Sequence, residues 1–242
     1  MPEPTPLSQL LPRTRPLAIA PLPVAKPGEC PDHPGNPAAY CGPCAGERKA
    51  VDPNARWEIH TERVRRDCDR RFPRRYRDAQ ADHPAVLDWT ATVVKDPEHA
   101  PSLLLLGPVG VGKTHQAYGA LRTVAPELPG RDWIATRFPD LLASLRPEPG
   151  GKPERRVEHY REAGLLLLDD LGVGKTSEWV EETTYRLIDG RYLDMRPSIF
   201  TTNLGVAELR DSIGDRIASR LAESCRIVVL DGPDRRRVGQ VA

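Results

Sequence analysis

The most constraining feature of this 242-residue chain is GPVGVGKT at 107–114, which directly follows the apolar run LLLL at 103–106. Glycines at these spacings let backbone N–H groups surround phosphates, while the lysine reaches the β- and γ-phosphates and the hydroxyl binds Mg²⁺. The apolar run is typical of a strand buried on both faces, and the residues after the loop indicate a helix whose N-terminus faces the phosphates. A glycine turn that binds nothing is the alternative, but strand, loop and helix in this order predict a nucleotide site. Its predicted contact residues are Gly107, Pro108, Val109, Gly110, Val111, Gly112, Lys113, Thr114 and His115.

A second GVGKT, at 172–176, lacks the leading glycine of the motif because Asp169 stands at that position. It follows a strand predicted at 164–168, after which come two carboxylates, Asp169 and Asp170. Acidic side chains at the C-terminal end of a buried strand suit Mg²⁺ and water, so we predict that they form the acidic (Walker B) element of the same site. We interpret the second GVGKT as a surface turn before the next helix and Lys175 as a solvated lysine.

From residue 80 onward, short apolar runs alternate with helical patterns, beginning with a helix predicted at 84–94. Alternation of this kind predicts an α/β fold with a parallel sheet covered on both faces, and ligands then bind at the carboxyl ends of the strands. The predicted strands are 103–106, 132–137, 164–168, 198–203 and 226–230.

The first part of the chain has a different composition. Eleven of the 26 prolines fall within the first 37 residues, so we predict that residues 1–27 form a disordered Pro-rich tail. The apolar stretch at 17–25 is too short and too broken by proline to span a membrane or to form a signal-peptide core. We therefore expect a cytoplasmic protein without a membrane partner. The formal net charge of +1 indicates neither nucleic acid nor membrane by itself.

Residues 28–50 contain CPDHPGNPAAYCGPC, in which two close pairs of metal-binding side chains are separated by a short loop. Such pairs can close a tetrahedral Zn²⁺ site, since each tight turn presents both side chains to one side. A redox or chance Cys-x-x-Cys is the alternative, and disulfides are less expected in the cytoplasm. We predict a structural zinc-binding module with Cys30, His33, Cys41 and Cys44 as ligands.

Residues 51–79 are predicted to form a basic helix and linker. Asp52 suits the N-cap, Pro53 suits the first helical position, and Phe72 followed by Pro73 marks the end. The apolar stripe is narrow, so the helix is expected to rest against another element. Its arginines fit contact with phosphates or with an acidic partner, and they equally fit ion pairs along a solvated helix.

In order and approximate spacing, GPVGVGKT, LLLLDDLG, RLIDGRY, RPSIFTTNL and GDRIASRL resemble AAA+ ATPases of the DnaC/IstB group, bacterial helicase loaders and transposition helpers. The resemblance covers about residues 73–237 and leaves out the N-terminal third. It implies an AAA+ P-loop NTPase core over 80–242, with a five-stranded parallel sheet and with ATP bound at subunit boundaries. Few residues follow the strand predicted at 226–230, so no C-terminal lid domain is expected.

The resemblance also implies roles for residues that match the motifs. Lys113 neutralises the β- and γ-phosphates, Thr114 and Asp169 hold Mg²⁺, and Asp170 orients or deprotonates the attacking water. Asn203, at the end of its strand, resembles a polar sensor of the γ-phosphate and the water. The alternative for Asn203 is an asparagine that satisfies a turn.

Three further assignments come from the same resemblance. Arg216 and Arg220, four residues apart on one helical face, match the element that offers an arginine finger to a neighbouring ATP. Arg220 is the first choice and Arg216 the second, and either could instead be a surface ion-pair partner. Tyr76 lies where related proteins pass near the adenine base. Residues 235–237 are all arginine and fit either a substitute nucleotide sensor or an exposed basic tail.

These features predict an Mg²⁺-dependent ATPase with ATP, Mg²⁺ and a structural Zn²⁺. The leading hypothesis is a DNA replication protein that loads or remodels a replicative helicase on single-stranded DNA through its N-terminal module, with ATP-dependent self-association into an oligomer. The alternative is an IstB-like transposition helper that acts on duplex DNA with a transposase. A third is a zinc-dependent DNA-binding adaptor with a vestigial ATPase site, but the intact motif residues argue against it.

Overall fold

The structure is a computed structural model that describes residues 53–146, 153–174 and 177–235. The chain divides into two units, residues 1–54 and 55–242. Of the first unit, the structure describes only residues 53 and 54, which begin a helix. The predicted zinc ligands and Lys175 lie outside these ranges. Within them, no group of three or more His, Cys, Asp or Glu side chains is placed to hold a metal ion. None of the described helices is long and apolar enough to cross a membrane.

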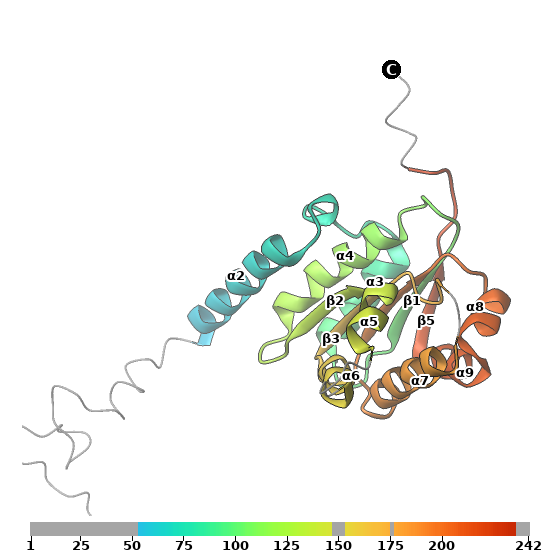
Figure 1. The fold of residues 1–242 in the computed structure, drawn as a ribbon. Coiled ribbons are helices and arrows are strands. Elements are labelled where there is room, and N and C mark those ends of the chain that lie inside the picture. Colours follow the sequence, from blue (N-terminus) through green and yellow to red (C-terminus); the bar gives the residue numbers. More distant parts are fainter. Residues whose placement is uncertain (1–52, 147–152, 175–176, 236–242) are drawn as a thin grey trace, which may run out of the picture. The chain divides into compact units, whose positions relative to one another are not determined.

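Five parallel strands form one sheet in the order β2-β3-β4-β1-β5 (Figure 1). This confirms the predicted five-stranded parallel sheet, with each strand within about two residues of its expected place. The order places β4 between β1 and β3, so the segments that follow these three strands meet at one edge. The strands are β1 (Ser102–Leu106), β2 (Trp133–Arg137), β3 (Leu165–Asp169), β4 (Ser198–Thr202) and β5 (Cys225–Val229).

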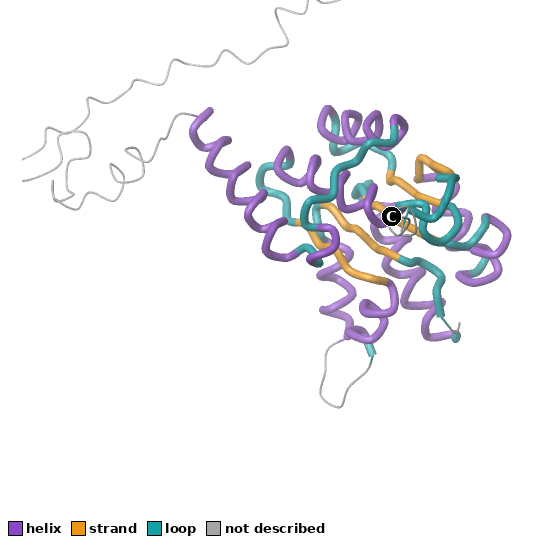
Figure 2. The backbone as a smooth tube through the Cα atoms, turned by 90° about the horizontal axis from the view of Figure 1, so that it is seen from above, coloured by secondary structure: helices purple, strands orange, loops and turns teal. Residues whose placement is uncertain are grey.

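Helices lie on both sides of the sheet, as Figure 2 shows from above. Leucines alternate between the two faces along the central strands: Leu103 and Leu105 of β1 join one buried cluster, and Leu104 and Leu106 join the other. This explains the uniformly apolar runs, since a strand covered on both faces has no solvent side. The helices are α2 (Pro53–Arg71), α3 (Pro84–Lys95), α4 (Lys113–Val124), α5 (Phe138–Leu145), α6 (Pro153–Glu162), α7 (Glu178–Leu193), α8 (Val206–Ile213) and α9 (Asp215–Ser224), with short 3-10 turns η3 (Arg74–Tyr76) and η4 (Ala125–Glu127).

Helix α2 packs on the same core as β1 and α4. Val64, Cys68 and Phe72 of its apolar stripe are buried in that cluster, and the Phe72 ring meets the Tyr118 ring of α4 edge-on at 4.9 Å between centroids. Trp57, near the start of the helix, remains 38% exposed. The expectation that this helix rests against another element is therefore confirmed for its second half.

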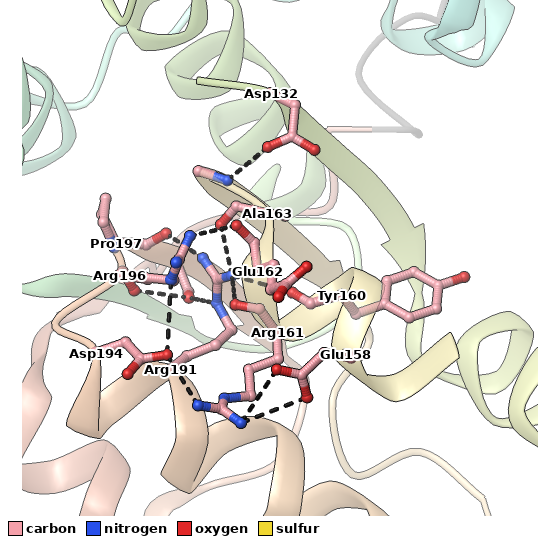
Figure 3. Close-up of polar contacts among 12 residues, drawn as sticks. Asp132, Glu158, Tyr160, Arg161, Glu162, Ala163, Arg191, Asp194, Arg196 and Pro197 are labelled. Atoms are coloured by element: carbon pink, nitrogen blue, oxygen red, sulfur yellow. Dashed lines mark hydrogen bonds and ion pairs between the residues drawn. The ribbon is translucent and has the colours of Figure 1, made fainter. Parts of the chain in front are cut away.

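The amino ends of β3 and β4 are joined by the buried guanidinium of Arg191 on α7 (Figure 3). This side chain is 2% exposed, and burial lowers its pKa to about 9, which leaves it protonated at neutral pH. Its three nitrogens donate to neutral oxygens of the segments that precede the two strands and of the first residue of β4. They are the Ser198 hydroxyl (2.7 Å) and the carbonyls of Tyr160 (3.0 Å), Arg161 (2.9 Å), Ala163 (2.7 Å) and Pro197 (2.8 Å).

We expect Arg191→Lys to lower the free energy of unfolding by about 2–4 kcal/mol, because an ammonium group cannot reach all five acceptors and leaves buried carbonyls unsatisfied. Urea denaturation followed by circular dichroism measures this. The matched control is Arg186→Lys on the exposed face of the same helix, which should be nearly neutral. Equal stability of the two variants would contradict a structural role for the network.

Candidate nucleotide-binding site

The glycine-rich loop joins β1 to α4 and ends where that helix begins, at Lys113. Gly110 and Gly112 have φ of +92° and +102°, a backbone region that glycine adopts without strain. The first N–H groups of α4 therefore face the loop, as anion binding at a helix N-terminus requires. The Lys113 ammonium lies over the loop, where it donates to the carbonyls of Gly107 (2.7 Å) and Pro108 (2.8 Å).

A pocket of about 360 Å³ opens beside this loop. The structure brings together there most of the predicted nucleotide-site residues, from the loop and from the ends of β3 and β4. Arg75, which was not predicted as a site residue, also lines it, and so does Arg235, for which the sequence left a nucleotide sensor and an exposed tail open. The predicted residues in its lining are Tyr76, Val109, Gly110, Gly112, Lys113, Thr114, His115, Asp170 and Asn203.

The acidic end of the site is a hydrogen-bonded group around Asp169. One carboxylate oxygen, Oδ1, accepts from the Thr114 hydroxyl (2.9 Å) and from the Thr201 hydroxyl (2.6 Å). The Thr201 oxygen in turn accepts from the backbone N–H of Asp170 (3.0 Å). Thr201 is a site residue that sequence reasoning missed, although its strand was recognised to end on polar residues.

The Asp169 carboxyl is 5% exposed, and this burial raises its pKa above the usual range, partly offset by the hydrogen bonds from the two threonines. A divalent cation beside it would favour the ionised form. A threonine hydroxyl and a carboxylate are hard oxygen ligands of the kind that Mg²⁺ prefers. The residues present therefore fit magnesium.

Asp170 lines this pocket, whereas Asp169 does not, and both carboxylates line a neighbouring cavity together with Thr114. The backbone φ of Asp170 is +60°, which is uncommon for a residue with a side chain. The Asp170 carboxylate pairs with the guanidinium of Arg137, at the end of β2, at 3.6 Å. The two neighbouring carboxylates thus have different surroundings, and Asp170 is the one placed to contact water in the pocket.

Asn203 is exposed and follows β4 directly. Its side chain has no hydrogen-bond partner among the residues that the structure describes, and the local turn bond comes from Thr202, whose hydroxyl accepts from Leu204 N–H at 3.2 Å. The alternative of a turn-satisfying asparagine therefore has no support in the geometry.

Tyr76 of η3 lines the other side of the pocket, where its ring stacks on that of Tyr118 at 4.9 Å and 7°. Burial raises the pKa of the Tyr118 hydroxyl, so the ring beneath Tyr76 is neutral at physiological pH.

The two finger candidates lie on α9 and do not line this pocket. Arg220 donates to the Asp189 carboxylate at 2.8 Å, and its guanidinium lies 4.5 Å from the Tyr192 ring centre. Arg216 is exposed, and no partner for its guanidinium occurs in the described part of the chain.

The second GVGKT lies outside the nucleotide pocket. Val173 N–H donates to the Asp170 carbonyl at 3.3 Å, which closes a turn, and Val173 and Gly174 are exposed. The part of this segment that the structure describes is thus a surface turn.

Comparison with known proteins gives consistent matches. The family model described as IstB-like ATP binding protein matches residues 61–239. An ATP-binding protein of an insertion sequence from Mycobacterium tuberculosis is 29% identical over 56% of this chain and 55% of its own length. The ATP-binding protein of insertion sequence IS21 from Pseudomonas aeruginosa is 31% identical over 50% of this chain and 44% of its own length.

The replicative helicase loader DnaC of Escherichia coli K12 is 23% identical over 50% of this chain and 49% of its own length. The chain thus spans about half the length of the curated relatives it matches. Among solved structures, the DnaC helicase loader has a TM-score of 0.58 and 25% identity, covering 66% of this chain and 100% of that one. The structure of DnaI, with a TM-score of 0.58 and 21% identity over 69% of this chain and 95% of its own, shares the fold.

We expect Thr201→Val to weaken Mg²⁺ dependence and to cut nucleotide turnover about 10- to 100-fold, because a nearly isosteric change removes the hydroxyl that orients Asp169. A Mg²⁺ titration of phosphate release measures both. Thr202→Val, one residue along the same strand, is the control, since the Leu204 N–H is the only partner of its hydroxyl among the described residues. Equal effects of the two changes would show that general damage to the strand, and not the Asp169 bond, matters.

Proposed function

Because this chain belongs to the IstB-like ATP-binding protein family, we propose that it binds and hydrolyses ATP and uses that cycle to act on a client protein at DNA. The relatives named above agree with the predicted resemblance to the DnaC/IstB group. The observation that carries the proposal is the convergence of the glycine-rich loop, Asp170 and Asn203 on one pocket at the carboxyl ends of β1, β3 and β4, with Asp169 bonded to Thr114 of that pocket.

Each residue has a defined task in this proposal. Lys113 exchanges its two carbonyl partners for β- and γ-phosphate oxygens, and Thr114 and Asp169 hold the metal. When bound, Mg²⁺ neutralises charge on the phosphates. Asp170 orients or deprotonates the attacking water, and Asn203 contacts the γ-phosphate.

The proposed site is completed by a second copy of the chain, which supplies an arginine finger. Neither α9 arginine lines the pocket of its own chain, so a finger from this helix has to act on a neighbour. We propose Arg216 as the finger in preference to Arg220, which reverses the order expected from the motif. Arg220 would first have to leave Asp189, whereas Arg216 is already exposed. ATP-dependent self-association follows from this arrangement.

We expect Arg216→Ala to lower ATP turnover about 10³-fold, because the transition-state charge loses its cation, while ATP binding by the isolated chain remains. Lys113→Ala should abolish ATP binding but keep a working finger. A mixture of the two variants should regain part of the turnover, because Lys113→Ala chains donate the finger to the intact nucleotide sites of Arg216→Ala chains. Steady-state phosphate release measures this, and a mixture as inactive as its components would contradict a finger in trans.

The leading client is a replicative helicase, because one of the relatives is a replicative helicase loader, DnaC. In this proposal the helicase is placed on single-stranded DNA. The transposition helper is the second candidate, because the insertion-sequence relatives are more similar in sequence, at 29% and 31% against 23%. The two candidates differ in the DNA that the ATP-bound protein prefers.

We also propose that the N-terminal module grips the client and is held together by a structural Zn²⁺. The motivation is the spacing of its two close ligand pairs, which suits a tetrahedral site. The proposed ligands are Cys30, His33, Cys41 and Cys44.

The test is binding of the full chain to single-stranded and duplex oligonucleotides, with and without ATP, by fluorescence anisotropy at fixed salt. ATP-dependent preference for single strands supports the loader, and preference for duplex supports the transposition helper. Elemental analysis of the same preparation should give one zinc per chain, lost in Cys41→Ser. DNA binding that does not depend on ATP would contradict both the loader and the transposition helper and would leave only the adaptor hypothesis. A wild-type protein without zinc would contradict the proposed zinc-binding module.

A further inference from the structure

The surface turn that follows the acidic pair is bonded to helix α8. The hydroxyl of Ser212, in the last turn of that helix, donates to the carbonyl of Gly172 at 2.7 Å. Gly172 is the first residue of the second GVGKT and lies two residues after Asp170. The repeat lies outside the nucleotide pocket, but its first residue is therefore joined to another part of the fold.

The backbone of the turn is itself held in place where α8 meets it. Leu171 N–H donates to the carbonyl of Thr201 on β4 at 2.8 Å. Gly172 is buried and has a φ of +80°. A Cβ at this position would lie 3.0 Å from the Cδ1 atom of Leu209 and 3.3 Å from the Oγ atom of Ser212. Glycine therefore allows α8 to approach the turn closely enough for the Ser212 bond.

Helix α8 leads directly into α9, which carries the proposed arginine finger. Gly214, with a φ of +88°, is the single residue between the two helices, and Arg216 is the second residue of α9. Ile213 and Ile217, on either side of this junction, are buried in one core cluster, whereas Arg216 is exposed. The Ser212 bond thus fixes the chain four residues before the finger.

We propose that Ser212 is a positioning residue for the arginine finger, because its bond to Gly172 sets where α9 presents Arg216 to the nucleotide of a neighbouring chain. The inference rests on the proposed function, in which that finger acts in trans. A misplacement of about 1 Å can cost about 100-fold in rate, so a tether close to the finger matters. The same turn carries Asp170 of the chain's own site. Each finger is then held by the acidic turn of one nucleotide site while it serves the next.

The test is a mixing experiment with full-length chains that supply either the nucleotide site or the finger. Arg216→Ala chains supply intact sites and Lys113→Ala chains supply fingers, so phosphate release by the mixture comes from fingers acting in trans. With Ser212→Ala added to the finger-supplying chain, the maximal turnover should fall about three- to tenfold, because the finger is less well placed. The same substitution in the site-supplying chain should have no comparable effect, since that chain has no finger.

Two further measurements separate a misplaced finger from general damage. The finger-supplying chain is titrated to saturation, so that weaker association between chains is not mistaken for lower maximal turnover. Binding of the N-methylanthraniloyl derivative of ATP to a chain with Ser212→Ala alone should match the wild type, because Ser212 does not line the nucleotide pocket.

Equal losses in the two placements would overturn the proposal, because Ser212 would then act through the turn on the site of its own chain. A loss that disappears at saturation, or no loss at all, would also overturn it. The starting mixture separates these failures from failure of the proposed function. If that mixture is inactive, the finger in trans is wrong and the role of Ser212 falls with it; if it is active and Ser212→Ala changes nothing, only the positioning role is wrong.

Discussion

The buried Asp169 carboxylate is the group on which the acidic end of the site depends. It lies at the end of β3 with 5% of its surface exposed, and an isolated charge in such a place would be costly. Hydroxyls from Thr114 and Thr201 both donate to its Oδ1. They come from the start of α4 and from β4, which reach Asp169 only because the strand order is β3-β4-β1. The proposed Mg²⁺ site therefore depends on the order of the strands in the sheet.

Much of this arrangement could be predicted from the chain alone, because the decisive signals are local. A strand buried on both faces needs an unbroken apolar run, and LLLL occurs in both β1 and β3. A phosphate loop needs glycines at fixed spacings, and GPVGVGKT has them. Parallel strands bring their carboxyl ends to one edge of the sheet. The sequence therefore predicts that the loop, the acidic pair and Asn203, which follow three of these strands, lie near one another.

Other parts of the site were not predictable because their roles depend on neighbours distant in sequence. Thr201 is an ordinary β-branched strand residue until β4 places its hydroxyl against Asp169. Arg191 belongs to a polar helix pattern, and only the fold surrounds it with five acceptors. Residues 235–237 fitted a sensor or an exposed tail equally well, and Arg235 was distinguished only when its backbone was found bonded to Gly110.

Three arginines outside the glycine-rich loop show how existing partners decide which guanidinium is available for another molecule. Arg191 has its donors saturated by oxygens of its own chain and is closed to any ligand. Arg220 pairs with the carboxylates of Asp189 at 2.8 Å and Glu223 at 3.7 Å, so use elsewhere requires breaking these pairs first. Arg235 has an exposed partner, Asp82, at 3.8 Å, and an exposed ion pair at this separation contributes little to stability. Of the three guanidinium groups, that of Arg191 is thus the least available to bind another molecule and that of Arg235 the most. The sequence motif alone does not reveal this order.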